Sequence, residues 1–355
     1  MSESQFRSKI YWVTFCFSIF VIWVHSTNWE LFLGQPGMET EAEAVRRVEY
    51  FFGERLGQMA VPGFFLVSAY LFYRNFTMDR LLSKWKSRIF SVALPYVLWN
   101  LLYYGGYVLG SRISGLGTIL NREPVPVDWK TVAEAAFFYR YNPVFWYLFQ
   151  LILLILLAPV LYLLLKRNGT AALFLAFLAF SIFKGWRLGA LNTDALFYYS
   201  FGAWAALHRE KQGAFVERGW GREWILPGTV LTAWTLTVWW FSRSGSILYN
   251  NPFATVTFRL AMAAGTWALV SFLPLGEARE FMKHNFFFVC RTFCGGSFCQ
   301  QGRSDAVFRL CCCGLAVFPA DAPGDDCGQP GGRLGASENG TGILPDFIRR
   351  AMSGE

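Results

Sequence analysis

One histidine early in the chain is well suited to acid–base chemistry. His25 lies in the apolar run IFVIWVHSTNWELF, with the polar residues Ser26 and Asn28 beside it. An unperturbed imidazole has a pKa of about 6.5, so it can remove a proton from a hydroxyl near neutral pH. A histidine near the end of an apolar helix is also common as a simple interfacial residue. The residue type alone therefore leaves both interpretations open.

Other polar side chains interrupt apolar segments further along the chain. Each costs several kcal/mol inside a membrane unless it is paired or faces water, so such residues are candidates for substrate contacts. Small residues for close helix packing and an aromatic belt at the membrane surface are the structural alternatives. With Asn28, the predicted substrate-binding residues are Ser68 and Tyr70 in VPGFFLVSAYLF and Trp146, Tyr147 and Gln150 in VFWYLFQLILL.

A short basic segment follows the first of these two runs. Arg80, Lys84, Lys86 and Arg88 lie between apolar segments, and cations of this kind bind phosphate groups. Lys and Arg are also enriched in the cytoplasmic loops of membrane proteins whatever their ligands. Both explanations stay open for each of the four residues.

The composition indicates that membrane helices hold these residues. The chain of 355 residues is 54% hydrophobic and 16% charged, with a mean hydropathy of +0.32, which argues against a soluble protein. About 17 to 25 apolar residues cross a ~30 Å hydrocarbon core as a helix. The predicted fold is an all-α, polytopic bundle of about ten transmembrane helices, near residues 10–33, 57–73, 88–109, 143–165, 170–186, 192–208, 224–242, 255–275, 284–300 and 305–320.

The distribution of charge predicts the orientation of this bundle. The net charge of +8 is explained by Lys and Arg in cytoplasmic loops, so nucleic acid is not expected as a partner. Basic residues gather between the second and third apolar segments and in two later turns. The N-terminus is therefore expected in the cytoplasm, and the long segments 34–56 and 110–142 are expected as external loops. The predicted location is the plasma membrane, with membrane lipid as a partner.

The order of several motifs resembles the membrane acyltransferase-3 family. A histidine in the first helix, VPGFFLVSAYLF, a basic loop leading to LPYVLWN, VFWYLFQLILL and LAPVLYLLL follow one another within residues 7–289. The resemblance implies transfer of an acyl group, usually acetyl, from cytoplasmic acyl-CoA to a hydroxyl of a cell-envelope sugar, polysaccharide or lipid. Acetyl-CoA is then a co-substrate, and neither a bound cofactor nor a metal is expected. His25 falls on the family's essential histidine, and the basic loop suits the phosphates of coenzyme A.

The sequence departs from the family pattern at two positions. The family favours an Arg or Lys eleven residues before the histidine, on the same helix face, and this sequence has Thr14 there. Either another helix supplies the basic partner, with Arg88, Arg187 and Arg259 as candidates, or the reaction proceeds without one. Ala69 stands where the family commonly has glycine, which is a small change.

A transporter or flippase for a lipid-linked sugar is the alternative function. Such a protein would also need many helices and few internal polar groups. The sequence shows no inverted internal repeat, which disfavours this alternative. Transfer of label from acetyl-CoA to envelope carbohydrate would separate the two functions.

The end of the chain differs from the rest. Seven of the eight cysteines lie in residues 290–355, and this segment has neither Trp nor Tyr. Cysteine codons read one base later encode Ala or Val, and Cys-Arg-Thr-Phe at 290–293 can then read Ala-Ala-His-Phe, a run typical of the family. We therefore predict an acyltransferase-like membrane domain at 1–289 and an aberrant Cys/Gly-rich tail at 290–355 produced by a frameshift near Val289. A genuine divergent tail is the alternative.

Overall fold

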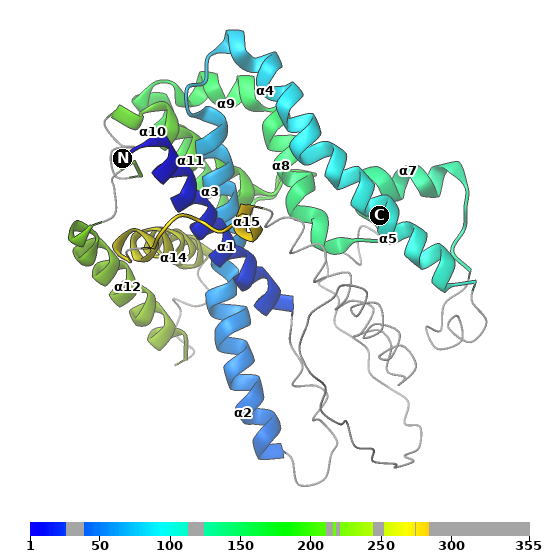
Figure 1. Ribbon diagram of the computed structural model, residues 1–355, viewed down its shortest axis with the longest axis horizontal. Coiled ribbons are helices and arrows are strands. Elements are labelled where there is room, and N and C mark those ends of the chain that lie inside the picture. Colours follow the sequence, from blue (N-terminus) through cyan, green and yellow to red (C-terminus); the bar gives the residue numbers. More distant parts are fainter. Residues whose placement is uncertain are drawn as a thin grey trace. The chain divides into compact units, whose positions relative to one another are not determined.

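The structure is a computed structural model that describes residues 1–25, 39–112, 124–210, 216–217, 221–243, 252–273 and 275–283 (Figure 1). The described residues form α-helices linked by short 3-10 and π turns, with no β-strand among them. The predicted all-α fold is thus confirmed. Asn28, the last two expected helices and the tail at 290–355 lie outside the described residues.

Eight of the ten expected apolar segments coincide with helices in the described ranges. Three helical runs, Glu3–His25, Glu43–Tyr73 and Ala254–Phe272, are long and apolar enough to cross a membrane, and one bent helix pair raises the number to four. The total of about ten stays a prediction. The helices are α1 (Glu3–His25), α3 (Ala60–Tyr73), α5 (Leu94–Gly110), α8 (Trp146–Leu156) with α9 (Ala158–Leu165), α10 (Asn168–Phe183), α11 (Thr193–Leu207), α12 (Ile225–Arg243) and α14 (Pro252–Phe272).

Both segments expected as external loops contain helix. α2 (Glu39–Glu49) continues through a π turn (Tyr50–Leu56) and a 3-10 turn (Gly57–Met59) into α3, so residues 39–56 are helical, and their external position stays a prediction. The acidic residues of this segment lie on a charged helix, where Glu43 pairs with Arg46 at 2.7 Å. The second segment holds α7 (Trp129–Phe137).

α3 packs against both α1 and α11 (Figure 1). A Cβ added to Gly63 would lie 2.3 Å from the Phe17 ring of α1, and one added to Gly202 of α11 would lie 2.5 Å from the Leu66 carbonyl oxygen. Real Cβ atoms do not approach other atoms so closely, so Gly202, which faces backbone, requires glycine, whereas at Gly63 the Phe17 ring would have to shift. The close packing considered for Gly63 and Ala69 is therefore present at Gly63, and Ala69 is fully buried.

A bend of 65° separates α8 from α9. Pro159 explains it, because proline has no amide hydrogen to donate to the carbonyl of Ile155 one turn earlier. Trp85 of α4 (Leu81–Arg88) donates to that carbonyl instead, at 2.9 Å. The hydroxyl of Tyr73 in α3 donates to the Ala158 carbonyl at 3.0 Å. Backbone groups at membrane depth need partners, and α3 and α4 supply them here.

α12 and α14 lie side by side (Figure 1), and α14 also packs on α1. The segment 275–283, which ends in α15 (Glu280–Lys283), runs beside the N-terminal half of α1. Trp12 donates to the Gly276 carbonyl at 3.1 Å, and the Ala278 amide donates to Ser8 Oγ at 2.7 Å. These bonds join the two ends of the described chain.

Candidate functional site

His25 is the last residue of α1, and its end of the helix packs against the turns that precede α3. A Cβ added to Gly57 would lie 2.4 Å from Val24 Cγ2, and one added to Gly53 would lie 3.3 Å from the Trp23 carbonyl oxygen. The two backbones therefore approach closely beside the histidine. The His25 side chain itself is exposed at this end of the bundle.

A polar cluster from α14 and α11 includes the same turn. Arg259 Nη2 donates to Gln58 Oε1 at 3.4 Å, and its Nη1 lies 3.6 Å from Asp194 Oδ2. Gln58 belongs to the 3-10 turn that packs against the end of α1. Arg187 lies within electrostatic range of the same carboxylate. Of the candidate basic partners for His25, Arg259 is thus held against the turn next to the histidine, and Arg187 lies close to that cluster.

Lys9, the basic residue of α1 nearest to the family position, contacts other helices. It is fully buried, and its Nζ lies 4.3 Å from the Trp224 ring centre and 4.5 Å from that of Trp267. Contacts of a cation with two aromatic faces offset part of the cost of burying the charge. Thr14, at the family position, donates to the Ile10 carbonyl at 2.8 Å. Lys9 therefore joins α1 to α14 and to the 3-10 turn (Arg222–Trp224) that precedes α12.

Ser68 and Tyr147, two predicted substrate residues, come together from α3 and α8. Ser68 Oγ lies 3.5 Å from the Tyr147 hydroxyl oxygen, and the Tyr147 ring packs 4.8 Å from that of Phe65. Arg88 of the basic segment lies within electrostatic range of this hydroxyl and of Tyr199 in α11. The structure therefore groups residues that were predicted from the sequence to have two separate roles, contact with substrate and contact with coenzyme A.

Gln150 and Trp146, also predicted to bind substrate, lie elsewhere on α8. The Gln150 amide donates to the Ala190 carbonyl at 2.9 Å and accepts from the Asn192 amide at 2.9 Å. Gln150 is buried and fixes the connection between α10 and α11 through both of its polar atoms. Trp146, in the first turn of α8, is 36% exposed.

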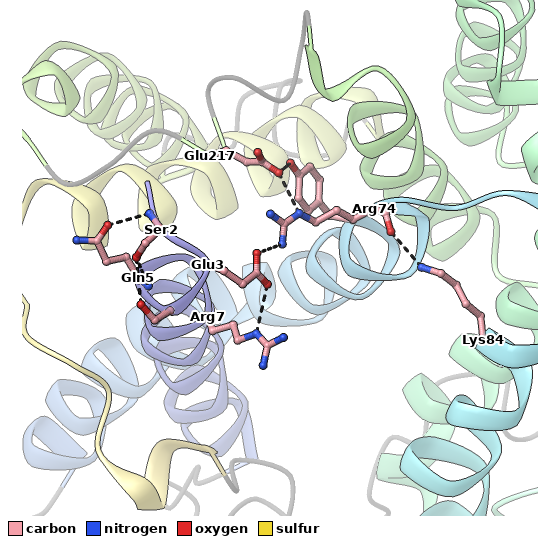
Figure 2. A network of polar contacts seen from close by, with 9 residues as sticks. Ser2, Glu3, Gln5, Arg7, Arg74, Lys84 and Glu217 are labelled. Carbon is pink, nitrogen blue, oxygen red and sulfur yellow. Dashed lines mark hydrogen bonds and ion pairs between the residues drawn. The ribbon is translucent and has the colours of Figure 1, made fainter. Parts of the chain in front are cut away.

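Tyr70 takes part in an ion-pair network at the N-terminal end of α1 (Figure 2). Its hydroxyl donates to Glu217 Oε1 at 3.1 Å. Arg74 Nε lies 3.0 Å from the same oxygen, and Arg74 Nη1 lies 2.9 Å from Glu3 Oε2. The guanidinium also packs over the Phe6 ring at 4.2 Å. The roles of Arg74 and Glu217 were not predicted from the sequence, although an arginine directly after an apolar helix and an acid in a basic loop were visible signals.

The predicted coenzyme A residues lie on and beside α4. Arg80 and Lys86 are exposed. The Lys84 ammonium donates to the carbonyls of Phe72 and, at 3.1 Å, of Arg74, at the end of α3 where helix carbonyls lack amide partners. Burial, together with the nearby arginines, lowers the pKa of Lys84 to about 8. Lys84 therefore supports the end of α3, whatever else it binds.

Several apolar, membrane-length helices with polar side chains held between them define a multi-pass membrane protein. Residues 10–298 match the acyltransferase-3 family, described as an acyltransferase domain, and the chain belongs to this family. The family implies acyltransferase chemistry and an acyl donor.

A curated relative connects the family match to polysaccharide synthesis. The chain is 30% identical over 195 residues to the succinoglycan biosynthesis protein ExoH of Rhizobium meliloti (strain 1021). The alignment covers 54% of this chain and 50% of ExoH, so it spans about half the length of that relative. No solved structure matches the chain. The boundary at 289 and the roles of individual residues stay predictions.

Proposed function

We propose that the protein is an O-acyltransferase that moves an acyl group, acetyl in the simplest case, from cytoplasmic acyl-CoA to a hydroxyl of a cell-envelope polysaccharide. The observation that carries this proposal is a histidine at the end of an apolar helix of an acyltransferase-family chain, with Arg259 held against the adjoining turn. The name of ExoH favours a polysaccharide over a lipid as acceptor.

In the proposed mechanism His25 is the general base. Its imidazole takes the proton of the acceptor hydroxyl while the hydroxyl oxygen attacks the thioester carbonyl carbon. The new ester C–O bond forms, the C–S bond breaks, and the proton passes to the departing thiolate of coenzyme A. Arg259, fixed by Gln58 and Asp194, supplies the positive charge that favours the oxyanion formed on the way.

The proposed orientation places the N-terminus of α1 in the cytoplasm. The exposed cations Arg80 and Lys86 then face the side from which acyl-CoA arrives. His25 lies at the other end of α1, towards the side where envelope polysaccharide is found. The donor and the acceptor would thus approach from opposite faces of the membrane.

Replacement of His25 by alanine tests the proposal. Membranes that contain the full chain are supplied with labelled acetyl-CoA, and label in envelope polysaccharide is measured. We expect His25→Ala to reduce transfer about 100-fold or more, because general-base catalysis contributes about 10²- to 10⁴-fold. His208→Ala is the matched control, since this histidine lies at the end of α11 with a ring nitrogen 3.0 Å from the Leu165 carbonyl oxygen. Transfer by the His25 variant at the parent's rate and expression level would refute the mechanism.

A further inference from the structure

The proposed donor and base sites lie at opposite ends of α1. Glu3, at one end, pairs with Arg74 after the last turn of α3, whereas Val24, at the other, meets Gly57 before its first turn. α3 and the preceding turn therefore run antiparallel to α1. At 1.5 Å per residue, the 23 residues of α1 measure roughly 34 Å. An acyl group carried by a donor whose phosphates bind beside α4 must bridge much of this length.

Four polar side chains lie along part of the distance between the two ends of α1. Arg88 lies over the Phe72 ring at 5.9 Å, near the end of α3. Ser68, one turn back along α3, meets the Tyr147 hydroxyl at 3.5 Å. Arg88 also lies within electrostatic range of Tyr147 and Tyr199. We call Arg88, Tyr199, Tyr147 and Ser68 the polar row.

Tyr199 is the member of the polar row whose hydroxyl lacks, among the described residues, a hydrogen-bond partner that a ligand could supply. Its side chain is fully buried, and its hydroxyl has no hydrogen-bond partner within the described part of the chain. A buried hydroxyl without a partner costs about 1–3 kcal/mol. The ring of Tyr73 lies 6.1 Å from that of Tyr199. The buried Tyr73 hydroxyl is paired, because it donates to the Ala158 carbonyl.

We infer that the polar row binds the pantetheine arm of the acyl-CoA donor. This inference rests on the proposed function. The arm carries two amide groups, whose carbonyl oxygens accept hydrogen bonds from the hydroxyls of Tyr199 and Tyr147, and it joins the phosphates to the thioester. Ser68 and Tyr147 are partly exposed, so the row is accessible at these residues. The arm thus carries the thioester from the basic segment on α4 towards the His25 end of α1.

Two probes separate binding of the arm from binding of the phosphates. Coenzyme A has the arm, whereas adenosine 3′,5′-bisphosphate has the nucleotide and phosphates without it. Calorimetric titration of the purified full chain should show that Tyr199→Phe and Tyr147→Phe each weaken coenzyme A binding about 3- to 10-fold, the effect of one hydrogen bond. Binding of the bisphosphate should not change. Tyr73→Phe is the control, because it removes a hydroxyl that already has a backbone partner, and it should leave both affinities unchanged.

Three outcomes would overturn the inference. Both tyrosine variants could bind coenzyme A as tightly as the parent, or they could lose affinity for both probes equally, which would show an indirect effect on the fold. The parent chain could also bind neither probe, which would refute acyl-CoA as the proposed donor as well. By contrast, full acyl transfer by His25→Ala with weakened coenzyme A binding by Tyr199→Phe would refute the general base and support the polar row.

Discussion

Lys84 combines a structural contact with a predicted ligand contact. Its ammonium donates to carbonyls at the end of α3 and lies in the segment expected to bind phosphate. With a pKa lowered by burial to about 8, this group is charged at pH 7 and mostly neutral at pH 9. We expect the affinity for acetyl-CoA to fall roughly 3- to 10-fold as the pH rises through about 8, because one charged contact with phosphate is lost. Titration calorimetry between pH 7 and pH 9 measures this change.

Two variants separate the roles of Lys84. Lys84→Arg stays charged over the whole range, so its affinity should not depend on pH. Lys84→Met should bind weakly at both ends of the range. A decline that persists in Lys84→Arg would assign the pH dependence to a different group and leave Lys84 with its contact to α3 alone.

Polar residues within apolar runs could be recognised from the sequence one at a time, and their roles as substrate contacts stay predictions. Ser68 and Tyr147 stood out as polar groups in apolar runs, and they do meet. The approach of Arg88 to Tyr199 was not predictable, since it depends on which helices pack together. Gln150 is also a polar residue in an apolar run, but its side chain binds the backbone of the connection between α10 and α11.

Gly202 sets the distance between α3 and α11. Gly202→Ala would place a Cβ 2.5 Å from the Leu66 carbonyl oxygen. This oxygen is a backbone atom, so it can move away only if α3 and α11 separate. We expect a loss of about 1–3 kcal/mol in the free energy of unfolding, measured by thermal or denaturant unfolding in detergent. Gly105→Ala is the control, because nothing lies within 4 Å of its added Cβ, and helix propensity alone should stabilise it by up to about 1 kcal/mol. Equal stability of the two variants would contradict the close contact.

Apolar runs predicted eight helical segments because hydrophobic length is a local property of the sequence. Breaks within those helices were harder to predict from the sequence. Pro95 lies in the first turn of α5, directly after a π turn (Ile89–Ala93), and Pro159 accompanies the 65° bend between α8 and α9. The helical structure of residues 39–56 was not predicted, because the first part of this segment is charged rather than apolar.

The predicted frameshift near Val289 can be tested on the whole molecule. Resequencing should reveal one inserted or two deleted bases, and the corrected frame should replace the residues at 290–293 with Ala-Ala-His-Phe. The corrected chain is expected to accumulate in membranes to a higher level than the present one, because Gly-rich sequence forms helix poorly and backbone groups outside a helix stay unpaired within lipid. Quantitative immunoblotting of membrane fractions compares the two. A single intact frame, with close relatives that end in the same way, would establish the tail as genuine.

The bend between α8 and α9 has a consequence for the order of assembly. Its carbonyls at Ile155 and Ala158 accept hydrogen bonds from Trp85 and Tyr73, which belong to segments synthesised earlier. Chains emerge from the ribosome N-terminus first, so both donors have already been synthesised when the broken helix pair is made. A circularly permuted chain that delivered α8 and α9 before α3 and α4 would expose these carbonyls to lipid until the later helices were made.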